Sequence, residues 1–231
     1  MPIELRKKGK KISEAGKKRT RLAPDDRREQ LVRIGARLFA EKPFSDVWIE
    51  AVAEQAGVSR GLVYHYFPNK RDFYAAIVKH GIDDTMRVTQ PDESLPPAQR
   101  LRASIDHLLE YIEANENAVR SVHRGQHSVD EEIVAVIRAG RDAQARRIAN
   151  FLMPGREPSP SLMLALEGWM NFNNAVIFEW LDTRAIERDA LLDLMSGALA
   201  GIIVAVMRVD PQSLDVGVLA DLEAQLADTP V

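Results

Sequence analysis

The stretch AGVSRGLVYHYFPNK, residues 56–70, concentrates side chains that donate hydrogen bonds or carry positive charge. An arginine such as Arg60 can donate two hydrogen bonds to O6 and N7 of a guanine in the major groove. Tyr64 and His65 can reach base edges or thymine methyl groups, and Tyr66 can donate to a phosphate oxygen. These residue types therefore indicate a surface that contacts double-stranded DNA.

A glycine and two capping residues predict the elements that must position these side chains. Gly57 is expected to end one short helix in the left-handed conformation, and Ser59 to cap a second over about residues 60–67. Asn69 would cap a further helix that begins at Lys70, whose ammonium group and free backbone amides together suit a phosphate. Two short helices joined around a glycine predict a helix-turn-helix.

The preceding residues supply the helices on which this unit would pack. Residues 25–42 place Leu31, Ile34, Leu38 and Phe39 at helical spacing. Pro43 is expected to end that helix, and Ser45 or Asp46 to cap the next one through residues 48–55. In the recognition segment, Leu62 and Val63 are expected to face inward.

The segment VAEQAGVSRGLVYHYFPNKRDFY resembles the DNA-binding signature of TetR-family transcriptional regulators, and the likeness covers about residues 27–77. The resemblance implies that the base-reading and phosphate-binding positions fall on Arg60, Tyr64, His65, Tyr66 and Lys70. This chain has Pro43 where the family usually has glycine, and Val47 and Trp48 where a Thr/Ser pair usually opens the second helix. A hydroxyl that commonly touches the DNA backbone is thus replaced, a role that Ser45 or the helix amides could take. The full set expected at the DNA is Ser45, Trp48, Ser59, Arg60, Gly61, Tyr64, His65, Tyr66 and Lys70, with Lys17, Lys18, Arg19 and Arg21 from the N-terminal arm.

That arm, residues 1–22, carries nine Lys or Arg against two Glu, a net charge of +7, whereas the whole chain has a net charge of −3. A basic arm without aromatic residues is commonly a solvated tail, and it is also a common device for holding nucleic acid. Both readings stay open. The second predicts that the arm follows the phosphates or enters the minor groove.

The composition bounds the class of protein. A chain of 231 residues with 45% hydrophobic and 28% charged residues can bury a core of one or two globular domains. The absence of cysteine excludes disulfides and thiolate zinc sites. No run of eighteen apolar residues and no signal core is visible, so we expect a cytoplasmic protein without a membrane partner. Nothing points to a cofactor.

Beyond residue 86 the pattern stays helical, and an all-α fold of about nine helices is predicted. The later helices are expected over about residues 101–115, 118–123, 129–152, 162–181 and 187–207. The segment TQPDESLPP separates them from the first four. The expected organisation is a flexible arm (1–24), a helix-turn-helix domain (25–70), a helical effector-binding and dimerisation domain (71–210) and a tail or short helix (211–231).

The segment LLDLMSGALAGIIVAVM, residues 191–207, is apolar nearly all round, so both sides of this helix must be covered. It is either a core helix or one face of a subunit contact, and Gly197, Ala198, Ala200 and Gly201 would permit close approach. In the family that the chain resembles, the last two helices pair with those of a second subunit. A homodimer of this kind would read an inverted repeat with recognition helices about 34 Å apart.

Polar and aromatic side chains among the apolar ones suggest an effector cavity in the helical domain, although each could equally be ordinary core. Family resemblance points to a small-molecule effector that releases the protein from DNA. The expected pocket residues are His107, Tyr111, His123, His127, Trp169, Phe172, Asn173, Val176 and Trp180. The spacing of His123 and His127 superficially suggests a metal site, but a loop with helix-starting acids explains it more simply, and no metal is predicted.

The sequence predicts a ligand-responsive DNA-binding repressor, and two other classes of protein are the alternatives. An enzyme is disfavoured, because no nucleophile elbow, zinc-protease motif or phosphate-binding glycine loop is present. A helical adaptor that has lost DNA binding remains an alternative, since residues 23–86 are nearly neutral and Val47 and Trp48 replace the usual pair.

Overall fold

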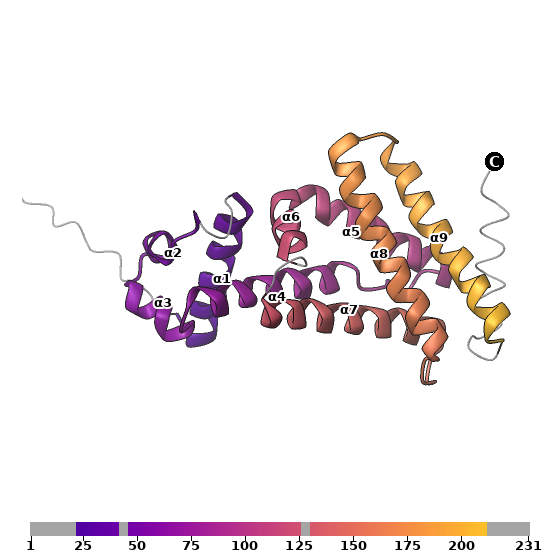
Figure 1. Cartoon of the computed structure of the whole chain (residues 1–231), viewed down its shortest axis with the longest axis horizontal. Coiled ribbons are helices and arrows are strands. Elements are labelled where there is room, and N and C mark those ends of the chain that lie inside the picture. Colours follow the sequence, from indigo (N-terminus) through magenta and orange to yellow (C-terminus); the bar gives the residue numbers. More distant parts are fainter. Residues whose placement is uncertain (1–21, 42–45, 126–129, 212–231) are drawn as a thin grey trace, which may run out of the picture.

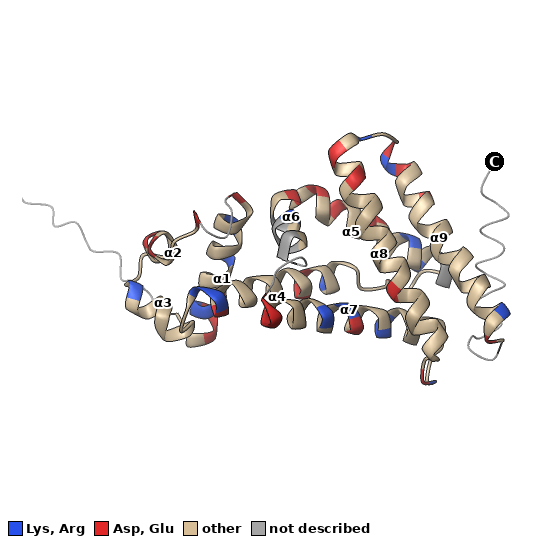
Figure 2. Cartoon of the chain, viewed as in Figure 1, with Lys and Arg blue, Asp and Glu red and all other residues tan. Residues whose placement is uncertain are grey.

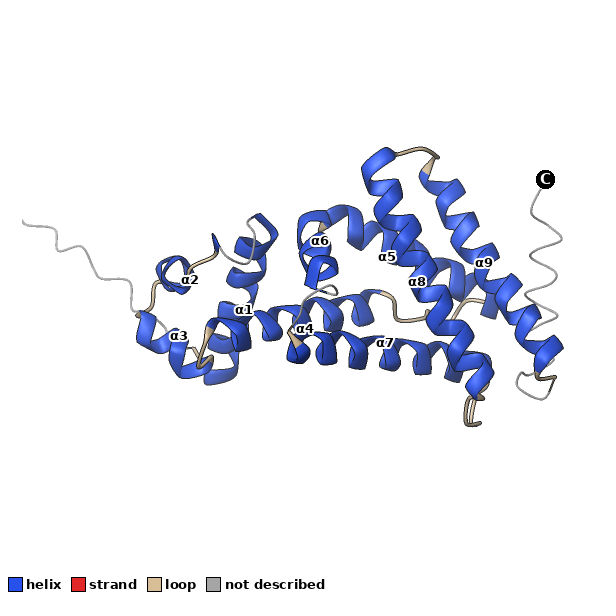
Figure 3. Ribbon diagram, viewed as in Figure 1, coloured by secondary structure: helices blue, strands red, loops and turns tan. Residues whose placement is uncertain are grey.

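The protein is described by a computed structural model that covers residues 22–41, 46–125 and 130–211. Those residues form α-helices and contain no strand, so the predicted all-α class is confirmed (Figure 3). The helices are α1 (Pro24–Glu41), α2 (Ile49–Ala56), α3 (Arg60–Tyr66), α4 (Lys70–Val88), α5 (Pro97–Ala114), α6 (Glu116–Gly125), α7 (Glu131–Leu152), α8 (Pro160–Thr183) and α9 (Arg188–Val209).

The helices form an elongated molecule with the first three at one end (Figure 1). Helices α4 and α7 lie side by side along its middle, and α8 and α9 form an antiparallel pair at the other end. Helix α6 contacts α1, so the helical domain touches the DNA-binding end through α6 as well as through α4. The family resemblance and the arrangement thus agree on a helix-turn-helix followed by a larger helical domain.

The helix ends around α3 follow the sequence prediction. Gly57 has φ 63° and donates its backbone N–H to the carbonyls of the last turn of α2. The Ser59 hydroxyl accepts from the Leu62 amide at 3.2 Å, and the Asn69 side chain accepts from the Asp72 amide at 2.9 Å. The start of α2 was predicted wrongly, because Asp46 is not its cap. The N-cap is Trp48, which makes no side-chain capping bond, because an indole has no hydrogen-bond acceptor to offer the first-turn amides.

A first apolar core joins the DNA-binding helices and continues beyond them. It contains Leu31, Phe39, Val52, Val63 and Phe73 and also takes in two isoleucines of α7. The expectation for Leu62 was wrong, since that side chain is only partly buried and lies outside the cluster. The cluster extends to residue 78, so the first turns of α4 pack with the helix-turn-helix past the domain boundary expected at residue 70.

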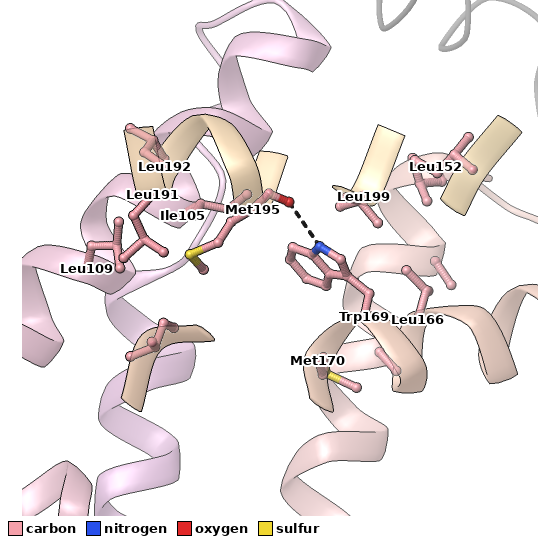
Figure 4. Packing of buried hydrophobic residues seen from close by; sticks show 14 of the residues in the cluster. Ile105, Leu109, Leu152, Leu166, Trp169, Met170, Leu191, Leu192, Met195 and Leu199 are labelled. Carbon is pink, nitrogen blue, oxygen red and sulfur yellow. Dashed lines mark hydrogen bonds between the residues drawn. The ribbon is translucent and has the colours of Figure 1, made fainter. Parts of the chain in front are cut away.

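A second apolar core lies between α5, α7, α8 and α9 (Figure 4). Within it the Trp169 indole N–H donates to the Met195 carbonyl at 3.0 Å, which ties α8 to α9. The Trp180 indole donates to the Ile186 carbonyl at 2.8 Å, near the turn between the same helices. Because a buried indole N–H needs an acceptor, these two bonds fix both tryptophans in place.

Helices α4 and α7 run in the same direction and are joined at both ends. At the start, the Arg71 guanidinium binds the Asp130 carboxylate at 2.5 Å, and Asp130 also caps α7. In the middle, a Cβ on Gly140 would lie 2.6 Å from Cγ2 of Ile82, so a larger residue there would force the two helices or the Ile82 side chain to move. At the far end, Arg147 of α7 donates to a backbone carbonyl of α4.

Helix α9 is long and apolar enough, by length and composition alone, to cross a membrane, although the sequence pattern predicts no such segment. Of the apolar window, 39% is buried inside the protein. Core helices of soluble proteins meet the same criteria, and α9 packs against α8 and α5. Figure 2 shows few charged residues on its visible face between its two ends.

Candidate DNA-reading surface and effector cavity

Helix α3 presents the predicted DNA-contacting residues at the end of the molecule. Arg60, Gly61 and His65 are exposed, whereas Tyr64 and Tyr66 are half-buried against the first core. Burial of one side of each tyrosine holds its ring, while the phenol can still reach outward. The short helix therefore carries an exposed guanidinium beside two half-buried aromatic rings.

Arg60 is held by two neighbours. Its Nη1 lies 2.7 Å from Oε1 of Glu50 on α2, and its Nη2 donates to the Tyr64 hydroxyl at 3.5 Å. The hydrogen bond with Tyr64 and then the charge of Glu50 raise the pKa of Arg60 above its usual value, so it stays cationic. Glu50 was not anticipated from sequence, because nothing in the spacing of α2 and α3 shows which side chains meet.

Val47 and Trp48 have different surroundings. Val47 is buried in the first core, whereas Trp48 is 66% exposed, and the Lys70 ammonium lies 5.7 Å from its ring centre. Burial lowers the pKa of Lys70, and the charge of Asp46 partly opposes this. A large, mostly apolar ring next to a cation thus occupies a position where the resembling family usually has a small hydroxyl.

Several predicted site residues lie outside the described part of the chain. These are Ser45, Lys17, Lys18, Arg19 and Arg21 of the DNA-binding set and His127 of the effector set. Ser59 is described, and its hydroxyl accepts from the Leu62 amide as the cap of α3. Among the described residues, no group of three acidic or histidine side chains could hold a metal ion.

A cavity of about 1040 Å³ lies between the two ends of the molecule, bounded by α1, α4, α5, α6, α7 and α8. Of the predicted pocket residues, Tyr111, His123, Trp169 and Asn173 line it. The volume suits a sizeable organic ligand, because small-molecule sites commonly span about 300–1,000 Å³.

The other predicted pocket residues do not line this cavity. His107 is exposed on α5, and Phe172 and Val176 of α8 are partly buried against the second core without lining the cavity. Trp180 lies at the far turn, where its indole binds the Ile186 carbonyl and the Arg184 guanidinium stacks on its ring at 3.8 Å. These four residues do not line the cavity. Phe172, Val176 and Trp180 lie along a helix 24 residues long and meet different neighbours along its length, whereas His107 lies on α5.

The polar groups of the cavity are few. Asn173 is 5% exposed, and its Oδ1 is buried without a hydrogen-bond donor among the described residues. Burial raises the pKa of the Tyr111 hydroxyl, which keeps it protonated and able to donate. The His123 ring stacks on Phe178 with centroids 3.8 Å apart. Because an unmade buried hydrogen bond costs about 1–3 kcal/mol, Asn173 is suited to accept from a bound ligand.

Part of the cavity wall was not foreseen. Arg33 and Arg37 of α1, and His80 and Asp84 of α4, line its side toward the DNA-binding helices. The polar residues on these helices follow the pattern of a solvent-exposed face, so the sequence did not indicate a cavity wall. This side of the cavity forms only where α1 and α4 meet the helical domain. The cavity therefore borders both the helical domain and the helix that supports the helix-turn-helix.

Two family models match this chain. The model for "Bacterial regulatory proteins, tetR family" matches residues 31–77, and that for "Tetracyclin repressor-like, C-terminal domain" matches residues 97–201. The first covers α2 and α3 with most of α1, and the second covers the helical domain from α5 into α9. The two cover the DNA-reading surface and most of the cavity wall.

Two named relatives and a solved structure belong to the same class of protein as the family models. The HTH-type transcriptional activator FasR of Mycolicibacterium smegmatis is 23% identical over 198 residues, which are 81% of this chain and 88% of the relative. The HTH-type transcriptional repressor DhaR of a Mycobacterium species is 24% identical over 182 residues, 74% of this chain and 76% of the relative. A crystal structure of a tetR-family transcriptional regulator from Streptomyces coelicolor superposes with a TM-score of 0.72 at 26% identity, covering 90% of this chain and 92% of that one. The chain therefore belongs to the TetR family of DNA-binding transcriptional regulators.

Proposed function

We propose that this regulator binds an inverted-repeat operator as a homodimer and represses transcription until a small-molecule effector occupies the cavity. The observation that carries the proposal is the exposure of Arg60 and His65 on α3, a helix fixed between the Gly57 turn and the Asn69 cap. A rigid element that presents donors at one end of the molecule is what reading of base edges requires.

The DNA contacts divide into two kinds. Arg60, Tyr64 and His65 are proposed to read base edges, while Tyr66, Lys70 and Trp48 hold the backbone on either side. Lys70 is suited to a phosphate because it sits in the first turn of α4, where free amides add to its charge. Backbone contacts set register and affinity, and base contacts set specificity.

The dimer contact is proposed on the outer face of α8 and α9. Leu164 is 74% exposed and Leu194 is 45% exposed on this pair of helices. A Cβ on Gly168, Gly197 or Gly201 would meet nothing within 4 Å, so packing within the subunit does not require glycine there. Exposed leucines beside unexplained glycines favour close approach of a second pair of helices.

The effector is proposed to act by population shift. Since the cavity borders α1 and α4, a ligand there can favour an orientation of the two helix-turn-helix units that does not fit the operator. Moving such an equilibrium from 1:99 to 99:1 requires about 5.5 kcal/mol of differential affinity. Apolar contacts with Trp169 and neighbouring residues could supply that, and Asn173 could fix the orientation of the ligand.

The basic arm, residues 1–22, is proposed to add phosphate contacts, because the helix-turn-helix region itself is nearly neutral. Each neutralised phosphate steepens the slope of log K against log salt concentration by about 0.9. A variant that lacks residues 2–21 should therefore show a shallower slope. An unchanged slope would remove the arm from the DNA contact.

The test begins with selection of bound sequences from random DNA by the full-length protein. We expect an inverted repeat with half-site centres about 10 base pairs apart. Arg60→Ala should then weaken binding to the selected site by about 1–3 kcal/mol with little effect on unrelated DNA, whereas Arg146→Ala, at an exposed position of α7, should change neither. Recovery of no enriched sequence at low salt would contradict the proposal. A reporter gene downstream of the selected site distinguishes repression from activation.

A further inference from the structure

Arg147 on α7 is a half-buried guanidinium without an acidic partner among the described residues. Its Nη1 donates to the Met86 carbonyl and its Nη2 to the Thr89 hydroxyl, each at 2.5 Å. Burial lowers its pKa, and no carboxylate counteracts this. Both acceptors lie at the C-terminal end of α4, where the helix dipole supplies only about half a negative charge. A buried charge is normally paired with an opposite charge. The positive charge of Arg147 is therefore only partly balanced by its two neutral acceptors and the helix end.

A small second cavity of about 50 Å³ lies beside this guanidinium. Its polar lining comprises Arg147, Arg100, Thr89, Ser104 and Gln144, and none of its lining residues is acidic. The Ser104 hydroxyl is buried and makes no hydrogen bond. A helical serine ordinarily bonds to a carbonyl of the preceding turn, so an unused buried hydroxyl indicates a missing acceptor.

Arg100 reinforces the positive character of this cavity. Its side chain donates to the backbone carbonyls of Leu95 and Glu93, at 2.5 and 2.6 Å, and forms no ion pair with a described residue. Exposed Asp92 does not line the cavity, and its pKa is lowered first by hydrogen bonds from Ser94 and only then by the charge of Arg100. Two guanidinium groups and a free hydroxyl thus surround the space.

The size of the space fits a head group and not a whole ligand. A single water molecule needs about 10–15 Å³ of cavity volume, so 50 Å³ holds only a few heavy atoms. Leu108, Gln144 and Trp169 line both this cavity and the large one. A ligand can therefore place an apolar body against Trp169 in the large cavity and its head beside Arg147.

We infer that the effector is a carboxylate with an apolar body, and that Arg147 and Ser104 bind its carboxylate group. The inference rests on the proposed effector site and names its ligand class. A planar carboxylate matches the guanidinium fork, and Arg147 uses only two of its five N–H donors within the described structure. The serine hydroxyl can donate to the same oxygens.

This position also connects the ligand to the DNA-binding end. Arg147 holds the last turn of α4, whose first residue, Lys70, is a proposed phosphate contact. A carboxylate on the same guanidinium pulls on a group that also holds the Met86 carbonyl, and so alters the restraint on α4. The helix is continuous over its 19 residues, about 28 Å, so a shift at one end moves the other.

Calorimetric titration of the full-length protein with matched acid and amide pairs tests the inference. The probes are hexanoate and hexanamide, decanoate and decanamide, and benzoate and benzamide, at pH 7. We expect at least one acid to bind at least tenfold more tightly than its amide. Equal binding of acids and amides, no binding of any acid, or equally tight binding of acetate or phosphate would each overturn the inference.

The variants are Arg147→Met, Arg147→Lys and Ser104→Ala, with Arg146→Met as the control. Arg146 is exposed on the same helix and pairs with Asp142 at 2.9 Å. Arg147→Met should weaken the best acid at least tenfold and leave its amide unchanged, and Ser104→Ala should weaken the acid severalfold. Ser104→Ala and Arg147→Lys keep the test decisive if Arg147→Met does not fold, because wild-type affinity in both would reject the assignment. Operator binding is measured on the same samples. If the wild type binds the operator but no acid, this inference alone is rejected. If the wild type binds no operator, the proposed function is rejected.

Discussion

Glu50 on α2 forms an ion pair with Arg60 on the recognition helix, with Oε1 and Nη1 2.7 Å apart. Both side chains are exposed, and exposed pairs contribute little to stability, typically about 0–1 kcal/mol. The main effect of this ion pair is therefore to orient the Arg60 guanidinium in the absence of DNA. The same carboxylate places a negative charge next to the surface that meets phosphates.

Glu50→Gln is expected to raise affinity for unrelated DNA and to reduce discrimination of the operator. Removing one negative charge near a phosphate changes binding by roughly fivefold at most, since a charge pair at 4 Å in water is worth about 1 kcal/mol. Discrimination falls because Arg60 loses a group that orients it. Fluorescence anisotropy titrations on selected and scrambled duplexes measure both. Glu54→Gln, exposed on the same helix, is the control, and an equal effect in the two variants would show that only net charge matters.

Gly201→Arg should abolish the proposed dimer and leave the subunit folded. A Cβ at Gly201 meets no atom within 4 Å, so the substitution introduces no clash within one chain. A charged side chain between two closely packed helix pairs would be buried without a partner. Sedimentation velocity measures the assembly, and circular dichroism measures the helix content. A variant that remains dimeric would place the contact on another face.

Gly35→Ala is expected to destabilise the first core. The added Cβ would lie 2.4 Å from Cζ of Phe73 and 2.6 Å from Cδ1 of Ile77, both in side chains that are themselves buried. Overpacking of this kind commonly costs about 1–3 kcal/mol. Urea denaturation measures the change in free energy of unfolding. Gly61→Ala, whose Cβ would lie 3.9 Å from the Ser59 hydroxyl, should show no such loss.

The Asp130 carboxylate predicts a specific acid dependence of stability. The hydrogen bond from Arg71 lowers its pKa below the usual value, and the amides of α7 add to this. A carboxyl whose pKa is lowered by folding stabilises the protein above its unfolded pKa, about 3.9, and loses that effect as the pH falls through the folded value. Asp130→Asn keeps a capping acceptor but not the ion pair with Arg71. The wild type should therefore exceed the variant in free energy of unfolding at neutral pH, and the difference should shrink below about pH 4.

Urea denaturation between pH 2.5 and pH 7 measures this difference. The double variant Arg71→Met/Asp130→Asn controls for the cap, because Asp130→Asn should have little further effect once Arg71 is absent. A difference that grows toward low pH would contradict the assignment.

Sequence reasoning predicted the fold well because its signals are local. Gly57, Ser59 and Asn69 specify turns and caps through their own backbones, so the helices around α3 could be placed before any packing was known. The cap of α2 was missed because Trp48 holds the N-cap position without a capping side chain. Leu62 was misplaced because α3 is only seven residues long, and about two turns give too few apolar positions to define its buried face.

Contacts between side chains of different helices were harder to predict from the sequence. Trp180 and His107 are residue types that often line ligand pockets, yet neither lines the cavity. Its position depends on how α1 and α4 pack against the helical domain. Glu50 near Arg60 and Met86 near Arg147 pair residues from different helices, and no spacing within one helix reveals such pairs. The chemistry of the ligand site thus emerged from tertiary contacts.

The three tryptophans have such different surroundings that their intrinsic fluorescence can report separate steps of the response to a ligand. Trp48 is exposed beside the recognition helix, whereas Trp169 borders the cavity and Trp180 is buried at the distal turn. Single-tryptophan variants in rapid-mixing fluorescence would separate ligand arrival, sensed by Trp169, from departure of DNA, sensed by Trp48. The lag between the two signals would give the order and the rate of the events that switch a promoter.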